Sequence, residues 1–367
     1  MTERITIGLM SGTSLDGADA VVMAFNGHAM KSLGHASLAF APALRAALSE
    51  LTLPGPDEIE RMGEASVALA HHYAQTVKLL LARTGLAPAN IDALCVHGQT
   101  IRHRPQKGFT MQLNHPALVA ELTGIDVVAD LRSRDVAAGG EGAPLVPAFH
   151  AECFTGDSAR IILNIGGIAN ISVLGARGES ACVLGADTGP GNMLIDTWTQ
   201  RITGALYDKN GDWAGTGRVN EALLGDLLRE PYFERPIPKS TGRELFSPAW
   251  LDKHLKGHEG LQPEDVARTL VELTTRTITD AIERFAPEAR ELYVCGGGVY
   301  NKTLMEAIAS RFPGLTTSTE ALGVPPMEVE AAAFAWLAAR FLDRLPGNLP
   351  AVTRAAGPRI LGALYPH

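Results

Sequence analysis

The stretch ITIGLMSGTSLDGADAVVMA, residues 5–24, places two apolar runs on either side of a turn rich in Gly, Ser and Asp. Apolar runs that flank such a turn are typical of a β-hairpin. The stretch IILNIGGIANISVL, residues 161–174, has the same form, with Gly166 and Gly167 at its centre. The sequence therefore predicts two glycine-centred hairpins about half a chain apart, alike in shape but not in letters.

The rest of the chain alternates between strand-like and helix-like patterns. Short continuous apolar runs predict buried strands, and apolar residues spaced by three or four predict helices. The predicted strands cover residues 93–96, 127–129 and 292–295, and the predicted helices cover residues 58–83, 263–285, 301–311 and 329–342. The first two of these strands deliver polar residues at their ends. The alternation indicates the α/β class.

A chain of 367 residues exceeds one ordinary core and fits two domains. The segment AAGGEGAPLVP, residues 137–147, concentrates Gly and Pro before the second hairpin begins. We therefore predict a first domain over residues 1–145 and a second over residues 146–328. The closing helix and tail, about 329–367, follow the second domain and could pack back on the first domain.

Composition argues against several classes of protein. The net charge of −8 comes from 40 acidic and 32 basic residues without a basic run, which argues against nucleic-acid binding. The first apolar run is too short for a signal peptide, and Asn and Gly interrupt the most apolar stretch, residues 161–176, which argues against a membrane span. Four scattered cysteines argue against a zinc site and against a disulfide framework. We expect a cytoplasmic protein.

The turn of the first hairpin, SGTSLDGAD at residues 11–19, suits a phosphate. Gly12 and Gly17 let backbone N–H groups approach an anion, and the Ser and Thr hydroxyls of the turn add donors. Asp16 or Asp19 could hold Mg²⁺ through water, because hard cations take carboxylate oxygens. A plain polar hairpin is the structural alternative, and the segment has no Gly-Lys-Ser/Thr of a Walker A loop.

Two further glycine-rich segments suit a nucleotide. LNIGGIANIS, residues 163–172, would form a second phosphate hairpin, and such paired hairpins clamp phosphates in a cleft between two lobes. A strand with a glycine bulge is the alternative there. YVCGGGVYN, residues 293–301, predicts a strand, three glycines and a helix start. These glycines would let adenine and its ribose lie against backbone, although such a loop also serves packing alone.

The segment GADTGPGNMLID, residues 185–196, carries our first choice for a general base. Asp187 follows an apolar run and precedes a helix, which is where open α/β sheets bind ligands. Gly189, Gly191 and Asn192 would present free N–H groups at the helix start. Asp187 as a helix N-cap is the alternative. An aspartic protease is excluded because no second Asp-Thr/Ser-Gly supplies the required carboxylate pair.

Two polar segments remain open in function. DLRSRDVAAGG, residues 130–140, follows a predicted buried strand, so an arginine such as Arg132 could bind a substrate carboxylate in a two-pronged contact. A salt bridge between the lobes is an equally good interpretation. KSTGRE, residues 239–244, is a further polar loop to which the sequence assigns no purpose.

Taken together, these segments resemble the anhydro-N-acetylmuramic acid kinases, in the same order and over essentially the whole chain. The most specific combination is MSGTSLDG with DTGPGN and EAAAFAWLA, supported by HGQTIRHRP, LNIGGIANIS, KSTGRELF and CGGGVYN. The resemblance implies a two-lobed α/β fold of the actin-like ATPase class, with ribonuclease H-like lobes and an active site in the cleft between them.

The resemblance also implies an ATP-dependent enzyme of cell-wall recycling. It would open the ring of 1,6-anhydro-N-acetylmuramic acid with water and phosphorylate O6, giving N-acetylmuramic acid 6-phosphate and ADP. Asp187 would activate the water, and Glu330 would assist near the sugar. An unperturbed Asp, with a pKa of about 3.9, is a weak base, so withdrawal of electrons through O6 would help it.

The remaining roles implied by the resemblance fall into three sets. Those for ATP are Gly12, Thr13, Ser14, Leu15, Asp16, Gly17, Ala18, Asp19, Asn164, Gly166, Gly167, Gly296, Gly297, Gly298 and Asn301. Those for the sugar are His97, Gln99, Thr100, Arg132, Gly189 and Asn192. Those for Mg²⁺, through water, are Asp16 and Asp19.

Two other functions stay open at this stage. An ordinary sugar kinase of the same fold would use Asp187 to deprotonate a sugar hydroxyl. A muropeptide sensor or an actin-like assembly protein would bind ligands without turnover. The sequence also leaves a homodimer open.

Overall fold

The computed structural model describes residues 3–12, 14–27, 29–178, 184–237, 239–242 and 244–367. The chain divides into two compact units: unit 1 contains Met1–Phe154 and Glu328–His367, and unit 2 contains Thr155–Met327. The Gly- and Pro-rich segment predicted a boundary before helix α5 (Val146–Cys153), after residue 145. The structure instead places the boundary after this helix. The reason is that α5 packs against α11 (Val329–Leu342) of unit 1.

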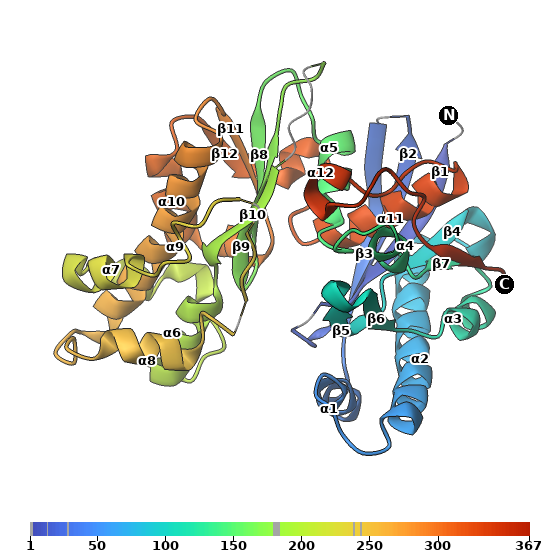
Figure 1. The fold of residues 1–367 in the computed structure, drawn as a ribbon, viewed down its shortest axis with the longest axis horizontal. Helices are drawn as coiled ribbons and strands as arrows, with labels where there is room; N and C mark the ends of the chain where they lie inside the picture. Colours follow the sequence, from blue (N-terminus) through green and yellow to red (C-terminus); the bar gives the residue numbers. More distant parts are fainter. Residues whose placement is uncertain (1–2, 13, 28, 179–183, 238, 243) are drawn as a thin grey trace. The chain divides into compact units, whose positions relative to one another are not determined.

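Unit 1 is built on a six-stranded sheet with the order β13-β7-β4-β1-β2-β3 (Figure 1). Its strands are β1 (Arg4–Met10), β2 (Gly17–Asn26), β3 (Ala29–Ala39), β4 (Ala93–Val96), β7 (Val127–Ala129) and β13 (Ala363–Tyr365). β1 pairs antiparallel with β2 and parallel with β4, and β4 pairs parallel with β7. A separate hairpin joins β5 (Gln99–Arg104) to β6 (Phe109–Leu113).

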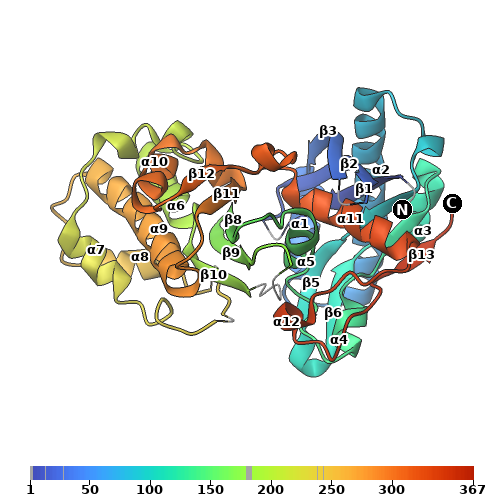
Figure 2. The same ribbon diagram turned by 90° about the horizontal axis from the view of Figure 1, so that it is seen from above.

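Helices cover both faces of this sheet. The alternation of side chains along β1 turns Ile7 and Leu9 into the core shared with α2, whereas Thr6 and Gly8 face α11. Thr6 Oγ1 donates to the Ala335 carbonyl of α11 at 2.7 Å. Figure 2 shows α11 crossing the sheet of unit 1. The helices are α1 (Pro42–Leu51), α2 (Glu58–Thr84), α3 (Pro116–Thr123), α4 (Ser133–Ala137), α5, α11 and α12 (Pro350–Thr353).

Unit 2 has a five-stranded sheet with the order β10-β9-β8-β11-β12. Its strands are β8 (Arg160–Ile165), β9 (Ile168–Leu174), β10 (Leu184–Pro190), β11 (Glu291–Cys295) and β12 (Leu315–Ser318). Its helices are α6 (Met193–Thr203), α7 (Glu221–Leu228), α8 (Pro248–Leu255), α9 (Pro263–Phe285) and α10 (Lys302–Arg311). The core lies between the apolar faces of β8 and β9 and the helices α6 to α10.

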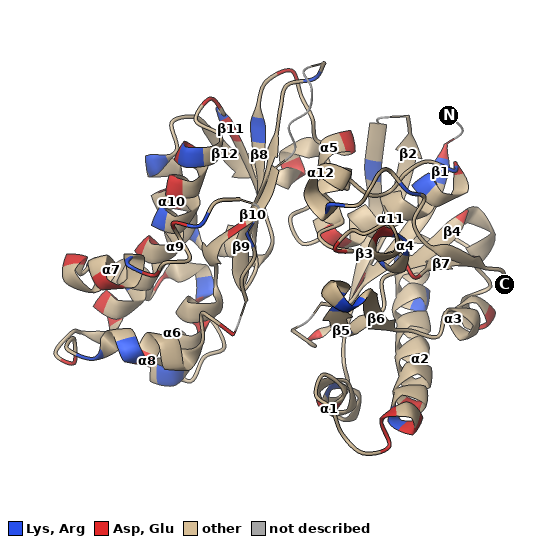
Figure 3. Cartoon of the chain, viewed as in Figure 1, with Lys and Arg blue, Asp and Glu red and all other residues tan. Residues whose placement is uncertain are grey.

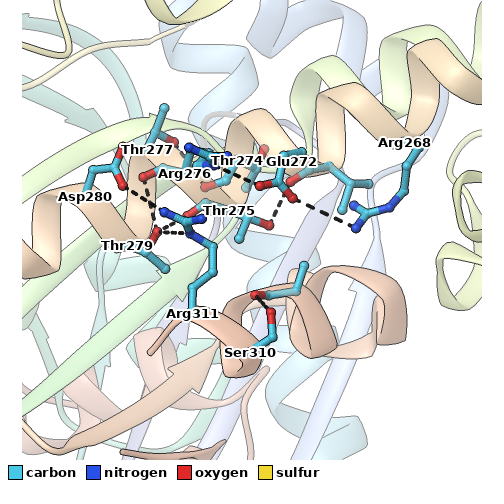
Figure 4. Close-up of polar contacts among 12 residues, drawn as sticks. Arg268, Glu272, Thr274, Thr275, Arg276, Thr277, Thr279, Asp280, Ser310 and Arg311 are labelled. Carbon is cyan, nitrogen blue, oxygen red and sulfur yellow. Dashed lines mark hydrogen bonds and ion pairs between the residues drawn. The ribbon is translucent and has the colours of Figure 1, made fainter. Parts of the chain in front are cut away.

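Helix α9 is the central support of unit 2, and it carries both apolar and polar contacts. On its polar side Glu272 lies 2.9 Å from Arg276 and 3.9 Å from Arg268, one helical turn away on either side (Figure 4). Arg311 of α10 donates through Nε to the hydroxyl of Thr279 at 3.0 Å. The Arg311 contact fastens α10 to α9, which in turn contacts β9 and β10.

The two sheets share one topology. Each sheet begins with a meander of three antiparallel strands, β1 to β3 in unit 1 and β8 to β10 in unit 2. The strand that follows in the sequence and belongs to the same sheet, β4 or β11, pairs parallel with the first strand of the meander. This is the ribonuclease H-like arrangement, and its presence in both units confirms the predicted actin-like ATPase class.

Charges of both signs are interspersed on each unit (Figure 3). Among the described residues, no helix is long and apolar enough to cross a membrane.

Candidate active site

Polar residues of unit 1 gather where its parallel strands end. Ser11 follows β1 directly, His97 follows β4 directly, and Arg132 comes shortly after β7. Because these strands run parallel, their carboxyl ends share one edge of the sheet. Open α/β sheets bind ligands at this edge, so the predicted sugar-contacting residues of unit 1 lie at an appropriate place.

His97 and Arg132 form a hydrogen-bonded pair, in which His97 is buried and Arg132 is half-buried. Arg132 Nε donates to His97 Nε2 at 2.9 Å. Burial, and then the charge of Arg132, hold the pKa of His97 well below its ordinary value, so the ring is neutral and carries its proton on Nδ1. Burial lowers the pKa of Arg132 to about 10, against the opposing charges of Glu330 and Asp135. The carboxylates that act on Arg132 therefore belong to its own unit.

Asp135 supports this pair through a network of hydrogen bonds. Its carboxylate is fully buried and accepts from Gly142 N at 2.8 Å, from Asn348 Nδ2 at 2.7 Å and from Thr353 Oγ1 at 2.7 Å. The Gly142 carbonyl accepts from Arg132 Nη1 at 2.7 Å. A buried carboxylate needs such donors. The C-terminal segment of the chain thereby fixes the loop that positions Arg132.

The turn of the first hairpin lies against Gln99. Gln99 Nε2 donates to the Gly12 carbonyl at 3.1 Å, while its Oε1 is buried without a hydrogen-bond partner among the described residues. A buried acceptor of this kind needs a donor, and a bound ligand can supply one. Leu15 adopts a φ of 59°, a strained backbone conformation that is common at functional turns. Thr13 lies outside the described residues.

The two predicted magnesium residues lie at the surface of unit 1. Asp16 Oδ1 lies 3.6 Å from Arg45 Nη2, and Asp19 Oδ1 lies 3.3 Å from His35 Nε2. The side chain of Asp16 is 73% exposed and that of Asp19 is 47% exposed. Within the described ranges, no three His, Cys, Asp or Glu side chains are grouped to hold a metal ion. An ion at these carboxylates would keep waters of its own, which is the mode that the sequence predicts.

Two of the predicted contact residues make hydrogen bonds within their own units. Thr100 Oγ1 accepts from Gln112 Nε2 of the β5–β6 hairpin at 3.2 Å. Asn301 is the N-cap of α10, and its Oδ1 accepts from Leu304 N at 3.0 Å. The role of Asn301 in the fold is therefore that of a helix cap.

The glycines of the predicted loops separate into two groups. A Cβ at Gly17 would lie 2.4 Å from the Leu38 carbonyl oxygen, one at Gly296 2.3 Å from Asn164 Oδ1, and one at Gly298 2.3 Å from Ile165 Cγ2, so packing alone requires these three glycines. In the other group an added Cβ would meet no described atom closer than 3.6 Å: Gly12, Gly166, Gly167 and Gly297. These four positions therefore leave space for a ligand, although the Gly166 N–H already donates to the Ile168 carbonyl at 3.2 Å.

The N–H groups at the start of α6 are not free, contrary to the prediction. Gly191 N donates to the Gly167 carbonyl and Asn192 N to the Gly166 carbonyl, both at 2.8 Å. The amide of the Asn192 side chain also donates, at 3.2 Å, to the Ile165 carbonyl. The helix start therefore holds the second glycine turn in place instead of offering its own donors to an anion.

Helix α9 holds the same loop through Thr274. The hydroxyl of Thr274 lies 3.0 Å from the Pro190 carbonyl and 2.9 Å from the Gly191 carbonyl. An added Cβ at Gly189 would lie 2.9 Å from the Phe233 ring and 3.2 Å from Thr277 Oγ1, so Gly189 is a close-packed position. The segment after Asp187 is thus rigidly supported.

Asp187 lies within β10, the edge strand of its sheet, and not beyond a strand end. Its partner in β9 is Asn170, and a bulge separates it from Gly189. The N-cap of α6 is Asn192, so the interpretation of Asp187 as a helix cap is wrong. The apolar run expected before Asp187 falls mostly on residues 179–183, outside the described ones.

Tyr232, Lys239 and Thr241 contact Asp187. Asp187 N donates to the Lys239 carbonyl at 3.2 Å, and its own carbonyl accepts from Tyr232 Oη at 2.8 Å. Its carboxylate accepts at Oδ2 from Thr241 N at 3.0 Å. The pKa of Asp187 is raised from 3.8 to about 6, mainly by burial and further by the charge of Glu244, against the Thr241 N–H. A carboxylate with this pKa is a stronger base than an ordinary Asp.

Sequence reasoning did not assign the residues that hold Asp187. Lys239 Nζ donates to the Tyr232 carbonyl at 3.2 Å and to the Phe233 carbonyl at 3.0 Å, which closes the segment on itself. The only signal was the polar loop KSTGRE, and its distance of about fifty residues from Asp187 gave no reason to connect the two.

Comparison with known proteins gives consistent matches. A family model described as "Anhydro-N-acetylmuramic acid kinase" matches residues 4–367. A protein of that name from Bordetella petrii is 53% identical, covering 99% of this chain and 96% of its own. Relatives with the same name from Cupriavidus metallidurans and Burkholderia thailandensis are 52% and 51% identical, covering 100% and 99% of this chain and 98% of their own.

Proposed function

The chain belongs to the anhydro-N-acetylmuramic acid kinase family, and from this premise we propose that Asp187 is its catalytic base. The substrates are ATP, water and 1,6-anhydro-N-acetylmuramic acid. The oxygen of water bonds to C1 while the C1–O6 bond breaks, and O6 takes the γ-phosphoryl group of ATP. One proton of the water passes to Asp187. The products are N-acetylmuramic acid 6-phosphate and ADP, so the enzyme is an ATP-dependent carbohydrate kinase of peptidoglycan recycling.

The placement of the Asp187 carboxyl in β10, where the Thr241 N–H holds it at 3.0 Å, is the observation that carries this proposal. Its pKa of about 6 leaves it mostly ionised at neutral pH, yet makes it a stronger base than an exposed Asp. The Thr241 N–H fixes Oδ2, whereas Oδ1 has no hydrogen-bond donor among the described residues and would face a water. Phosphoryl transfer to O6 makes that oxygen a better leaving group, so a base of moderate strength suffices.

The nucleotide is assigned to the open glycine turns. Backbone N–H groups around Gly12 and around Gly166 and Gly167 would contact phosphate oxygens, and Gly297 would lie against adenosine. Asp16 and Asp19 would hold Mg²⁺ through water, since both carboxylates are exposed and such ions retain several waters. A bound Mg²⁺ supplies positive charge beside the transferring phosphoryl group.

The sugar is assigned to the polar residues at the sheet edge of unit 1. Arg132, held by His97, would bind the carboxylate of the sugar, because guanidinium and carboxylate groups match in a two-pronged contact. The unpartnered Oε1 of Gln99 would accept from a sugar N–H or hydroxyl. Glu330, whose charge acts on Arg132, would assist beside the sugar.

Incubation in ¹⁸O-water with Mg-ATP and 1,6-anhydro-N-acetylmuramic acid tests the reaction. The product should carry one ¹⁸O at C1 and the phosphate at O6, as read by mass spectrometry. A kinase that phosphorylates a pre-existing hydroxyl would add no solvent oxygen, and a sensor would bind the sugar without consuming ATP.

Asp187→Asn tests the base. We expect nucleotide binding to be retained and turnover to be lost, because the amide cannot take the proton. Full turnover in this variant would remove Asp187 from the mechanism. We also propose a cytoplasmic location, where ATP is available.

A further inference from the structure

The loop Lys239–Glu244 is the one singled-out segment to which the proposed reaction assigns no role. Two of its described residues contact the proposed base: the Lys239 carbonyl accepts from Asp187 N, and Thr241 N donates to Asp187 Oδ2. The ammonium of Lys239 is anchored by two carbonyls and lies 4.6 Å from the centre of the Tyr232 ring. Lys239 and Thr241 therefore contact both the backbone and the side chain of Asp187.

The hydroxyl of Thr241 is the unexplained group in this loop. Its Oγ1 is shielded from solvent, yet no hydrogen-bond partner for it lies among the described residues. Buried hydroxyls in folded proteins are nearly always paired, and leaving one unpaired costs about 1 to 3 kcal/mol. The amide of the same residue is bonded to the Asp187 carboxylate, so this hydroxyl belongs to the immediate surroundings of the proposed base.

We propose that Thr241 is a second catalytic residue, whose hydroxyl binds the water that Asp187 activates. The proposal rests on the proposed role of Asp187. The water gives one hydrogen to the free oxygen of the Asp187 carboxylate and the other to Thr241 Oγ1. Its lone pair is then directed at C1. As the O–C1 bond forms, the first proton passes to Asp187, and the electrons of the C1–O6 bond pass to O6, which takes the phosphoryl group.

Two acceptors are needed for this orientation. A water held by a carboxylate alone can rotate about that single hydrogen bond, whereas a second contact fixes the direction of attack. The contact to Oδ2 comes from the Thr241 backbone N–H and not from the side chain, so the hydroxyl and the placement of Asp187 can be tested separately.

Thr241→Val removes the hydroxyl and keeps the shape and the backbone N–H. We expect kcat to fall roughly tenfold to a hundredfold. The KM values for sugar and ATP and the pH of the acid limb should stay near those of the wild type. Thr241→Ser should keep most of the activity. The matched control is Thr199→Val on α6, because Thr199 also carries a buried hydroxyl without a partner among the described residues. That variant should turn over normally.

Two results would overturn the proposal. The first is wild-type kcat in Thr241→Val. The second is a loss of kcat in that variant accompanied by a shifted acid limb, which would make Thr241 only a support for Asp187. If valine prevents folding, Thr241→Ala gives the same comparison. Asp187→Asn is measured alongside. If it stays active, the proposed base fails, whereas an inactive Asp187→Asn with a fully active Thr241→Val defeats the Thr241 proposal alone.

Discussion

Replacing Asp187 with Asn should stabilise unit 2 at neutral pH while abolishing turnover. Folding raises the pKa of this carboxyl from 3.8 to about 6, so the folded state disfavours its ionised form. At about 1.4 kcal/mol for each tenfold change in proton affinity, the rise amounts to about 3 kcal/mol when the group is fully ionised. Asn has the same shape and can still accept from the Thr241 N–H, so most of this amount should appear as added stability.

The pH dependence distinguishes this effect from ordinary repacking. Between about pH 4 and pH 6 the unfolded chain has released the Asp187 proton and the folded chain still binds it, so the stability of the wild type falls as pH rises through this window. The Asn variant lacks that fall. Its advantage in free energy of unfolding should therefore be only about 0.5 kcal/mol at pH 4, where the unfolded Asp is already partly ionised, and should reach its full size above pH 7.

Urea titrations of both proteins at several pH values between 4 and 8 measure this difference. The comparison at pH 4 is the internal control, because both side chains are then neutral in the folded state. A difference in free energy of unfolding that is independent of pH would refute the reasoning that burial disfavours the ionised form of this carboxyl. An Asn variant less stable than the wild type at pH 7.5 would refute it as well.

Three further perturbations test other parts of the structure. Glu244→Gln removes a negative charge that raises the pKa of Asp187, so the acid limb of the kcat/KM profile should move to lower pH; an unmoved limb would show that this charge has no influence. Thr353→Val removes one of the three donors to buried Asp135 and should lower the free energy of unfolding by about 1 to 3 kcal/mol in urea, with Thr353→Ser as the control that keeps the hydroxyl. Gly8→Ala would place a methyl group 1.9 Å from a backbone oxygen of α11. We expect the free energy of unfolding, measured by heat or urea, to fall by roughly 1 to 3 kcal/mol or more. Unchanged stability would mean that α11 shifts without penalty.

The sequence predicted the elements whose pattern is local. The long helix at Pro263–Phe285 has the predicted bounds, and the helix Val329–Leu342 is likewise where its spacing places it. Both hairpins formed because two apolar runs flank a turn that contains glycine. In each case the residues that determine the element lie within it or beside it, so a single stretch of sequence is sufficient evidence.

The surroundings of Asp187 could not be predicted in this way. β10 contains two glycines and a proline, and it is a strand because β9 pairs with it. The Thr241 N–H that fixes the carboxylate and the Glu244 charge that adds to the rise in its pKa both come from a segment about fifty residues later. The N–H groups at the start of α6 looked available because the pattern of a helix start says nothing about which carbonyl will approach it.

The discontinuity of unit 1 has a consequence for the synthesis of the protein. The chain leaves this unit at Phe154 and re-enters it at Glu328, so unit 2 is complete on the ribosome before unit 1 has received α11 and β13. Until then one face of the first sheet exposes Gly8 and Thr6 to water without their helix, and the buried Asp135 lacks two of its donors. A nascent chain that stalls or ends before α11 would thus contain a complete unit 2 and an incomplete unit 1. We expect quality-control proteases to cleave such a chain within unit 1.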